Sequence, residues 1–286
     1  MIRPVGAGTL FVVATPLGNL EDLTLRALRV LREVSLVACE DTRRTGQLLL
    51  AQGFKTPTTS FFEHNERWKG ERILEALRAG RDVALVSDAG TPGISDPGYR
   101  LVRDARAEGL KVVPVPGPSA VIAALSVSGL PTDRFRFVGF LPRRTIARRK
   151  ALEELQADRD TLVFYESPVR VTAMLADALE ALGDREAFLC REATKLHEEY
   201  RRGRLGQLLA LLRERDRVRG EIVLVVAGQS GEKPAGAESA AVLVARLQSD
   251  GLTRRQAVKQ AAARLGLPAR EVYRLALEAP NEPSDE

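Results

Sequence analysis

The sequence predicts an α/β protein built from two α/β domains, followed by a small helical extension. Two observations lead to this fold class. Apolar β-type runs alternate with amphipathic segments from residue 9 to about residue 228, and such alternation favours largely parallel sheets covered by helices. Beyond that point, residues 240–277 keep a helical period and contain no candidate strand.

The expected elements can be placed by their residues. Strands are predicted at 9–14, 35–39, 82–87, 111–115, 134–140, 161–166, 186–192 and 220–228. Segments long enough to be crossover helices lie between strands, among them 23–33, 66–79, 149–156 and 169–182.

Proline and glycine mark the expected domain boundaries. Residues 116–135 are punctuated by both residue types around one short apolar helix, and residues 228–239 have the composition of a linker. We therefore predict domains at 1–118 and 119–230, and a linker with a small helical domain at 231–286.

The last segment is predicted to form a helix, a tight turn and a second helix. Thr253 is the expected N-cap of the first helix, Gly266 follows that helix, and Pro268 opens the second. Basic residues outnumber acidic ones here, with Arg254, Arg255, Lys259, Arg264, Arg270 and Arg274 against Glu271 and Glu278. Two interpretations remain open, a helical cap with solvated basic faces and a helix-turn-helix-like accessory for nucleic acid.

The composition of the chain excludes several classes of protein. The chain has 286 residues, a net charge of +5 and only two cysteines and two histidines. Cys39 and Cys190 lie in apolar runs typical of buried thiols, so a disulfide framework and Cys/His zinc sites are excluded. No apolar stretch approaches the ~20 residues that span a bilayer, and the first residues carry no targeting pattern. We expect a cytoplasmic protein, and the charge modestly favours a polyanionic partner.

Three loops rich in proline and glycine follow predicted strands in the first half of the chain. They cover residues 15–20, 88–93 and 116–120. Because the carboxyl ends of parallel strands form the ligand crevice of an open sheet, these loops are expected to build one wall of exposed backbone groups. Glycine permits close approach and proline reduces motion, so the wall is typical of a site for a polar small molecule.

The motifs in and around these loops resemble a known family. They are "VATPLGNLEDLTLRAL", "EDTRRTGQLL", "LVSDAGTPGISDPGYRLV", "VVPVPGPSAVIAALSVSGLPTDRFRFVGFLPRR", "LVFYESPVR", "REATKLHEEY" and "GEIVLVVAG". Together they are similar to the ribosomal RNA small subunit methyltransferase I family, which has the tetrapyrrole (corrin/porphyrin) methylase fold. The resemblance implies a homodimer that transfers a methyl group from S-adenosylmethionine to the 2'-hydroxyl of a cytidine in small-subunit ribosomal RNA, without a metal.

The resemblance also implies a donor site in the cleft between the two α/β domains. Carried over onto this sequence, its residues are Pro16, Leu17, Gly18, Asp88, Gly90, Thr91, Ser119, Ala120, Tyr165, Glu166, Ala193, Thr194, Glu221 and Ile222.

Removing the proton of a ribose hydroxyl calls for a nearby base. Candidates cluster at residues 40–43, at residues 63–66 and at Asp96, and among them we select Glu66 and His64 as catalytic residues. The alternative for Asp41 and Glu66 is a structural role at a helix N-terminus. For contacts with RNA phosphates we select Arg43, Arg143, Arg144, Arg148, Arg149 and Lys150.

Two other functions remain open. A methylase of the same fold could act on a tetrapyrrole, whose carboxylates would pair with arginines. A non-catalytic RNA-binding assembly factor could keep the fold without turnover. The three proline- and glycine-rich loops are not needed for RNA affinity alone, whereas the basic segment 143–150 and the helical tail are not needed for a macrocycle.

Overall fold

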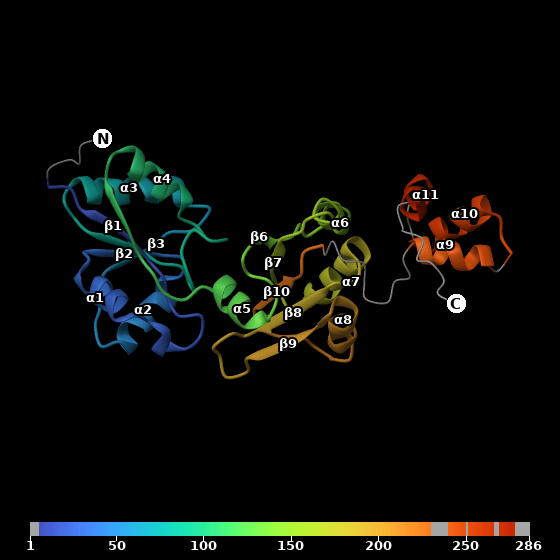
Figure 1. Ribbon diagram of the computed structural model, residues 1–286. Helices are drawn as coiled ribbons and strands as arrows, with labels where there is room; N and C mark the ends of the chain where they lie inside the picture. Colours follow the sequence, from blue (N-terminus) through green and yellow to red (C-terminus); the bar gives the residue numbers. More distant parts are fainter. Residues whose placement is uncertain (1–5, 230–239, 250, 266–268, 278–286) are drawn as a thin grey trace. The chain divides into compact units, whose positions relative to one another are not determined.

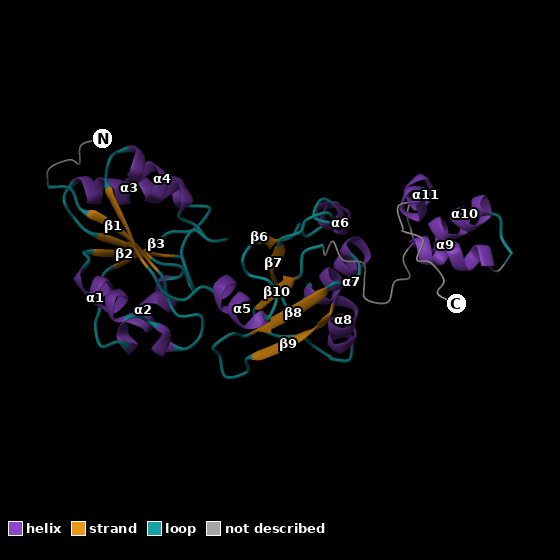
Figure 2. Ribbon diagram, viewed as in Figure 1, coloured by secondary structure: helices purple, strands orange, loops and turns teal. Residues whose placement is uncertain are grey.

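A computed structural model describes residues 6–229, 240–249, 251–265 and 269–277 of the chain (Figure 1). The chain divides into two compact units, Met1–Gln229 and Ser230–Glu286. The first unit contains two five-stranded sheets with their helices, and the second is helical (Figure 2). The α/β fold class and the helical end are therefore as the sequence predicts.

The first sheet is parallel throughout, in the order β3-β2-β4-β1-β5. Its strands are β1 (Thr9–Val13), β2 (Leu36–Cys39), β3 (Thr58–Ser60), β4 (Val83–Leu85) and β5 (Lys111–Val115). Four helices connect them, α1 (Leu25–Glu33), α2 (Thr42–Ala51), α3 (Glu66–Arg78) and α4 (Tyr99–Ala107), and a short 3-10 helix, η1 (Leu20–Asp22), precedes α1. All five strands end at one edge, so the loops that follow them lie at that edge.

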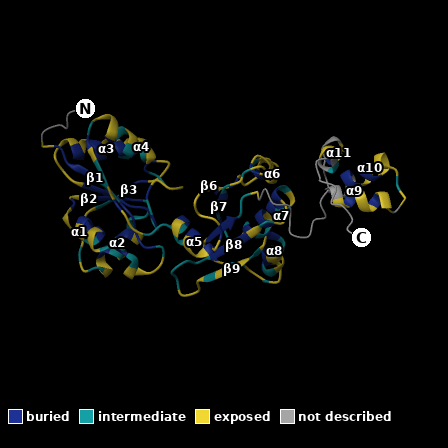
Figure 3. Cartoon of the chain, in the orientation of Figure 1, coloured by how far each residue is buried: buried dark blue, intermediate teal, exposed yellow. Residues whose placement is uncertain are grey.

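Helices cover both faces of this sheet, as Figure 1 shows. Residues of α1 and α2, such as Leu31 and Leu49, form one buried cluster, and residues of α3 and α4, such as Leu77 and Leu101, form the other. The central strands β1, β2 and β4 are mostly buried, while the outer helix faces are exposed (Figure 3). This two-sided burial explains the continuous apolar runs of the strands.

The second sheet is mixed and has the order β6-β7-β10-β8-β9. Its strands are β6 (Phe135–Phe140), β7 (Thr161–Glu166), β8 (Glu186–Arg191), β9 (Glu199–Arg204) and β10 (Ile222–Val226). Only β6 and β7 pair in parallel; the other three pairs are antiparallel. The expectation of largely parallel sheets is thus wrong here, because β8 and β9 form a hairpin and β10 inserts antiparallel between β7 and β8.

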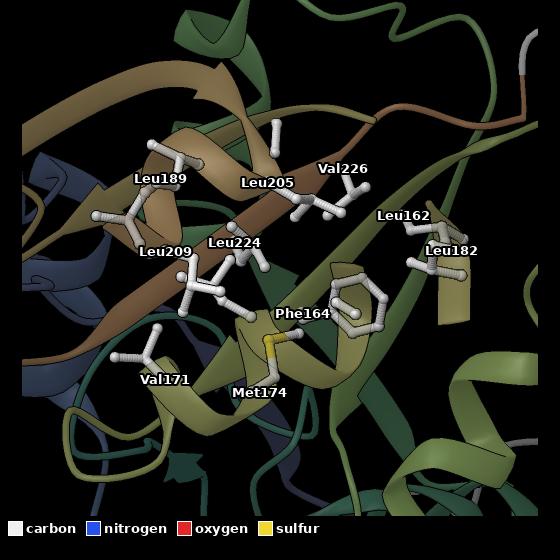
Figure 4. Close-up of a cluster of buried hydrophobic side chains, with 14 of the residues drawn as sticks. Leu162, Phe164, Val171, Met174, Leu182, Leu189, Leu205, Leu209, Leu224 and Val226 are labelled. Carbon is white, nitrogen blue, oxygen red and sulfur yellow. The ribbon is translucent and has the colours of Figure 1, made fainter. Parts of the chain in front are cut away.

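Residues of β10 alternate between the two faces of this sheet. Ile222, Leu224 and Val226 point into a cluster formed with α6 (Thr145–Glu153), α7 (Val171–Leu182) and α8 (Leu205–Arg213). Figure 4 shows the centre of that cluster, where Phe164, Met174 and Leu224 pack together. Val223 and Val225 face the opposite cluster, which includes Val121 and Leu125 of α5 (Ala120–Ser128). The helix α5 therefore packs on the second sheet, although it follows the last strand of the first.

The second unit contains α9 (Ala240–Ser249), α10 (Arg254–Leu265) and α11 (Ala269–Leu277). Its own core includes Leu243, Leu247, Ala261 and Val272. Helix α10 begins directly after Thr253, whose backbone N–H donates to Gln256 Oε1 at 3.0 Å. The expected turn residues Gly266 and Pro268, like Glu278, lie outside the described residues. Within the described parts of the chain, no helix is long and apolar enough to cross a membrane.

Both cysteines are free and buried, as predicted. Burial raises the pKa of the Cys190 thiol to about 11 and also raises the pKa of Cys39, so both remain protonated at neutral pH.

Candidate functional site

Hydrogen bonds join the three proline- and glycine-rich loops at the carboxyl edge of the first sheet. The backbone N–H of Thr15 donates to the carbonyl of Gly90 at 2.9 Å, and the N–H of Gly90 donates to the carbonyl of Thr15 at 3.0 Å. The hydroxyl of Thr91 donates to the carbonyl of Pro118 at 3.0 Å. The expectation that the three loops meet is therefore confirmed.

Beside these loops lies a cavity of about 330 Å³, which is also lined by residues of the second sheet. It contains most of the residues predicted for the donor site, namely Leu17, Asp88, Gly90, Thr91, Ser119, Ala120, Tyr165, Glu166, Ala193, Glu221 and Ile222. Its volume falls within the ~300–1,000 Å³ typical of sites for small molecules. Both sheets thus contribute to one pocket.

Three of the predicted residues do not line this pocket. Pro16 and Gly18 line a neighbouring cavity of about 350 Å³, which shares Leu17 and Asp88 with the first. The hydroxyl of Thr194 accepts a hydrogen bond from the N–H of Asn19 at 3.2 Å. The first loop is therefore tied to the segment that follows β8.

A lysine strengthens the connection between this segment and the first loop. The side chain of Lys195 lies directly against Gly18, at a place that a Cβ atom would fill. Its ammonium group donates to Glu192 at 2.9 Å and to Glu221 at 3.1 Å. Because Glu221 lines the pocket, Lys195 links the first loop to the pocket wall from the second sheet. The sequence interpretation missed this residue, which lies next to the "REAT" motif.

Acidic side chains from two neighbouring strand ends gather at one side of the pocket. Glu40 follows β2, and Asp88 and Asp96 follow β4; all three line the cavity. The carboxylate of Asp88 accepts from the N–H of Asp41 at 3.1 Å and from Arg44 at 3.2 Å, which partly balances its charge. Asp96 has no such cationic neighbour among the described ion pairs.

The protonation of Asp96 is set by its surroundings. Burial, and next the negative charge of Glu40, raise the pKa of Asp96 to about 7. Burial also raises the pKa of Glu40. A carboxyl group with a pKa near neutrality can exchange a proton with a substrate at physiological pH, which ordinary carboxylates do poorly.

Glu166 closes the pocket at the end of β7. Its side chain is fully buried and lies 3.1 Å from the guanidinium of Arg170, which also donates to the carbonyl of Leu141 at 2.7 Å. Next to it, burial raises the pKa of Tyr165 to about 12, and the ring of Tyr165 packs edge-on against Phe137 and Phe140. This wall therefore combines packed aromatic rings with one buried carboxylate.

The structure does not bring Glu66 or His64 into the pocket. His64 is exposed, and Glu66 is the first residue of α3, where its carboxylate accepts from the N–H of Gly98 at 3.2 Å. Asp41 is likewise the N-cap of α2, accepting from the N–H of Arg43 at 2.8 Å. The structural roles that we kept as alternatives for Asp41 and Glu66 are therefore present.

The predicted phosphate-binding arginines differ in their availability. Arg148 is buried, and its guanidinium lies 2.6 Å from Asp177, which is buried as well. The prediction that Arg148 contacts RNA is therefore wrong, because this cation belongs to the packing of α6 on α7. Arg149 is half exposed and pairs with Asp177 and Glu180. The exposed residues are Arg43, Arg143, Arg144 and Lys150.

Several pocket residues escaped the sequence interpretation. They are Ala89, Ile94, Ser95, Phe140, Ser167, Pro168, Cys190 and Val223. Ser95 adopts a positive φ of 62°, which is unusual for a residue with a side chain. Its hydroxyl lies beside Gly139, at a bulge in β6 where a Cβ atom would approach to 3.3 Å. In the sequence, the only sign of this close approach is Gly139 within the apolar run "FVGF".

Comparisons with known proteins agree with this geometry. The sequence pattern of the family described as Tetrapyrrole (Corrin/Porphyrin) Methylases matches residues 9–209. A protein of Halalkalibacterium halodurans named "Ribosomal RNA small subunit methyltransferase I" is 46% identical, and the match covers 94% of each chain. A Thermotoga maritima protein of the same name is 49% identical, over 78% of this chain and 99% of its own length.

Among solved structures, the uroporphyrin-III-C-methyltransferase from Thermus thermophilus has the same fold. It superposes with a TM-score of 0.56 at 25% identity, covering 77% of this chain and 94% of its own. The family match at residues 9–209 includes the whole first sheet, all three loops of the pocket and strands β6 to β9 of the second sheet. The chain therefore belongs to the tetrapyrrole (corrin/porphyrin) methylase family and, within it, to the ribosomal RNA small subunit methyltransferase I group.

Proposed function

We propose that the chain transfers a methyl group from S-adenosylmethionine to the 2'-hydroxyl of a cytidine in small-subunit ribosomal RNA. The observation that carries the proposal is the pocket that three hydrogen-bonded loops of the first sheet share with the second sheet. The names of the relatives at 46% and 49% identity support an RNA substrate over a small molecule.

The pocket residues fit such a donor. The backbone of Ala89, Gly90 and Ser119 offers polar groups without bulky side chains, and Val223 and Phe140 offer apolar contacts. The acidic residues Asp88 and Glu221 suit the positive charges of the donor. When bound, S-adenosylmethionine supplies a methyl group already activated by its sulfonium. The work left to the protein is to orient the donor and the acceptor and to remove one proton.

We propose Asp96, in place of Glu66 and His64, as the group that takes the hydroxyl proton. Asp96 lines the pocket and has a pKa of about 7, whereas the carboxylate of Glu66 is occupied by the N–H of Gly98. Glu66 then acts as a positioning residue, since Gly98 lies two residues after Asp96. Glu40, through its negative charge, favours the protonated form of Asp96 that results.

For the RNA phosphates we propose Arg143, Arg144, Lys150 and Arg43, which are exposed. Arg43 bonds the carboxylate of Asp41, so its contact with phosphate requires that this bond be exchanged. We also propose that the protein forms a homodimer and lies in the cytoplasm. We further propose that the first unit divides into two domains near residue 118. A role of the helical unit in nucleic-acid binding is proposed with them.

The experiment measures methyl transfer from labelled S-adenosylmethionine. Small ribosomal subunits and their free RNA, both from a strain lacking this modification, are incubated with the protein, and the methylated nucleotide is mapped. Label at a cytidine ribose is the expected result. Label only in a tetrapyrrole would favour the small-molecule methylase, and donor binding without transfer to any substrate would favour the assembly factor.

A further inference from the structure

The start of α3 and the loop before it carry exposed aromatic rings and three cations that form no ion pair among the described residues; one of the cations, Lys69, donates to the hydroxyl of Thr59 at 2.9 Å. Trp68, the only tryptophan of the chain, is 53% exposed, and Phe62 is 39% exposed. The ring of Phe62 meets that of His64 edge-on, with the ring centres 6.4 Å apart. We refer to Phe62, His64 and Trp68 as the aromatic face. These rings lie within the seven residues 62–68, and exposed large rings are typical of binding sites.

Cations surround the tryptophan. The ammonium of Lys69 lies 4.8 Å from the ring centre of Trp68, and the guanidinium carbon of Arg72 lies 5.4 Å from it. Within the described part of the chain, no carboxylate is in ion-pair distance of Arg67, Lys69 or Arg72. Most other exposed arginines on the helices and loops around the first sheet form an ion pair with a carboxylate. Arg29, for example, pairs with Glu33.

Two of the three acidic residues in this segment pair with cations other than Arg67, Lys69 and Arg72. The carboxylate of Glu66 is only 11% exposed and faces Gly98 and Arg100, and Glu71 pairs with Arg78. Glu63 is the one exposed carboxylate without an ion pair among residues 62–72 of the described chain. Lys69 and Arg72 therefore flank the ring of Trp68 without taking part in an ion pair among the described residues, and a ring flanked by cations suits unpaired bases joined by phosphates.

The aromatic face is connected to the pocket through Glu66. This residue lies between His64 and Trp68, and its carboxylate accepts from the N–H of Gly98 at 3.2 Å. Gly98 follows the pocket residue Asp96 by two positions, and Tyr99, the next residue, is 70% exposed. The start of α3 is therefore bonded to the segment 96–98, whose first residue lines the pocket.

The aromatic face is also held in place. The buried side chain of Asn65 accepts from the N–H of Phe62 at 2.8 Å and donates to the carbonyl of Ser60 at 3.3 Å. These bonds fix the loop between β3 and α3, so that little order has to be gained when a base stacks on it.

We propose that the aromatic face, with Arg67, Lys69 and Arg72, stacks unpaired bases of the RNA next to the nucleotide that is methylated. This inference rests on the proposed function, because it assumes an RNA substrate. It adds a specific contact surface, on an element that the pocket does not include.

Tryptophan fluorescence tests the proposal directly, since Trp68 is the only source of the signal. Titration of the full chain with an unstructured RNA oligonucleotide should quench the emission, whereas an RNA duplex or inorganic polyphosphate should not. Quenching that grows with protein concentration in the absence of RNA would instead assign the face to a second copy of the chain, and would overturn the proposal.

Affinity measurements with labelled RNA supply the second test. Trp68→Ala should weaken binding about 5- to 100-fold, the range expected for one base–aromatic stack. Trp68→Phe, which keeps a ring, should change it less than about threefold. The matched control is Leu25→Ala, which removes an apolar side chain that is 86% exposed on α1. Equal affinity of Trp68→Ala and the wild type would contradict the proposal.

The positive charges are tested by salt dependence. Arg72→Ala should reduce the slope of log Kd against log salt by about one, because one phosphate contact is lost. Arg29→Ala should leave the slope unchanged, since Arg29 is already paired.

Turnover separates this inference from the proposed function. We expect Trp68→Ala to raise KM for the RNA substrate and to leave kcat and donor affinity within about threefold of the wild type. If wild-type protein methylates small subunits and Trp68→Ala does so with the same KM, only the aromatic face is refuted. If the wild type methylates no RNA, the proposed function fails whatever the fluorescence shows.

Discussion

At the scale of single residues, Gly90 occupies a position that excludes side chains. Its φ is +82°, and a Cβ atom there would lie 3.3 Å from Leu17 Cδ2. Both its N–H and its carbonyl bond Thr15, so the residue cannot relax without separating two loops. The sequence predicts a backbone role for Gly90, because glycine adopts a positive φ and permits close approach without steric strain.

Gly90→Val should therefore weaken donor binding. The left-handed conformation costs a residue with a side chain about 1–2 kcal/mol, and the shifted loops should raise the donor Kd by more than about tenfold. Calorimetric titration with S-adenosylmethionine measures the effect. The control is Gly46→Ala in α2, where a Cβ atom meets nothing within 4 Å. Unchanged donor affinity of Gly90→Val would show that this loop does not form the donor site.

Asp96 is the residue whose role the sequence could suggest but not decide. Several acids follow strands in this chain, and only the fold shows that Asp96 lines the pocket and that burial and Glu40 raise its pKa. Burial depends on contacts between residues distant in sequence, so no local pattern reports it.

The pKa of Asp96 leads to a prediction about pH. A base must be ionised to accept a proton, and with a pKa of about 7 the ionised fraction of Asp96 rises between pH 6 and pH 8. We expect single-turnover methylation to rise through this window and then to level off. Asp96→Asn should lower the rate at least about 100-fold and abolish this rise, with donor affinity within about threefold of the wild type.

The matched control for this prediction is Asp104→Asn, an exposed carboxylate of α4 that does not line the pocket. A wild-type rate that does not change with pH, or an Asp96→Asn variant with a normal rate, would remove Asp96 from the chemistry.

At the scale of elements, strand prediction succeeded where burial is two-sided. The core strands β1, β4 and β10 are apolar runs, whereas β9 reads "EYRRGR" and was missed because most of it is exposed at the sheet edge. The direction of strand pairing was missed as well. An apolar run has the same composition in parallel and antiparallel pairs, so the mixed second sheet follows from connections rather than from composition.

Helix α6 also shows why a basic run is ambiguous. "RRTIARRK" places Arg148 inward, where it bonds the buried Asp177 of α7, while Arg143 and Arg144 stay exposed. The helix begins at Thr145, four residues before the predicted start. The arginines that face α7 therefore could not be derived from the predicted helix.

Two variants of α6 should therefore behave differently. Arg148→Ala leaves Asp177 buried with only Arg149, and should cost about 3 kcal/mol of unfolding free energy, or roughly 6–12 °C in Tm. Arg144→Ala should leave Tm within about 2 °C and weaken RNA binding instead. Thermal unfolding followed by circular dichroism and RNA titration separates the two effects. Equal stability of both variants would show that the ion pair with Asp177 does not support the packing.

At the scale of the whole molecule, the sequence indicated a ligand crevice at the first sheet, and the pocket confirms that location. The sequence alone did not show which residues of the second sheet complete it. Ala193, Glu221 and Ile222 came from the family resemblance, and Phe140 and Cys190 from the fold alone. A pocket shared by two sheets depends on packing between residues distant in the sequence, and no short sequence pattern reports such packing.

The division into two units leads to the last prediction. Every hydrophobic cluster among the described residues lies within one unit, and the Thermotoga maritima relative matches over 99% of its length while covering 78% of this chain. A chain that ends at Gln229 should therefore fold and bind S-adenosylmethionine with unchanged affinity. If α10 and α11 assist in RNA binding, as proposed, this shortened chain should show a higher KM for small subunits and an unchanged kcat. Loss of donor binding on truncation would contradict the independence of the two units, and an unchanged KM would assign the helical unit a role outside RNA binding.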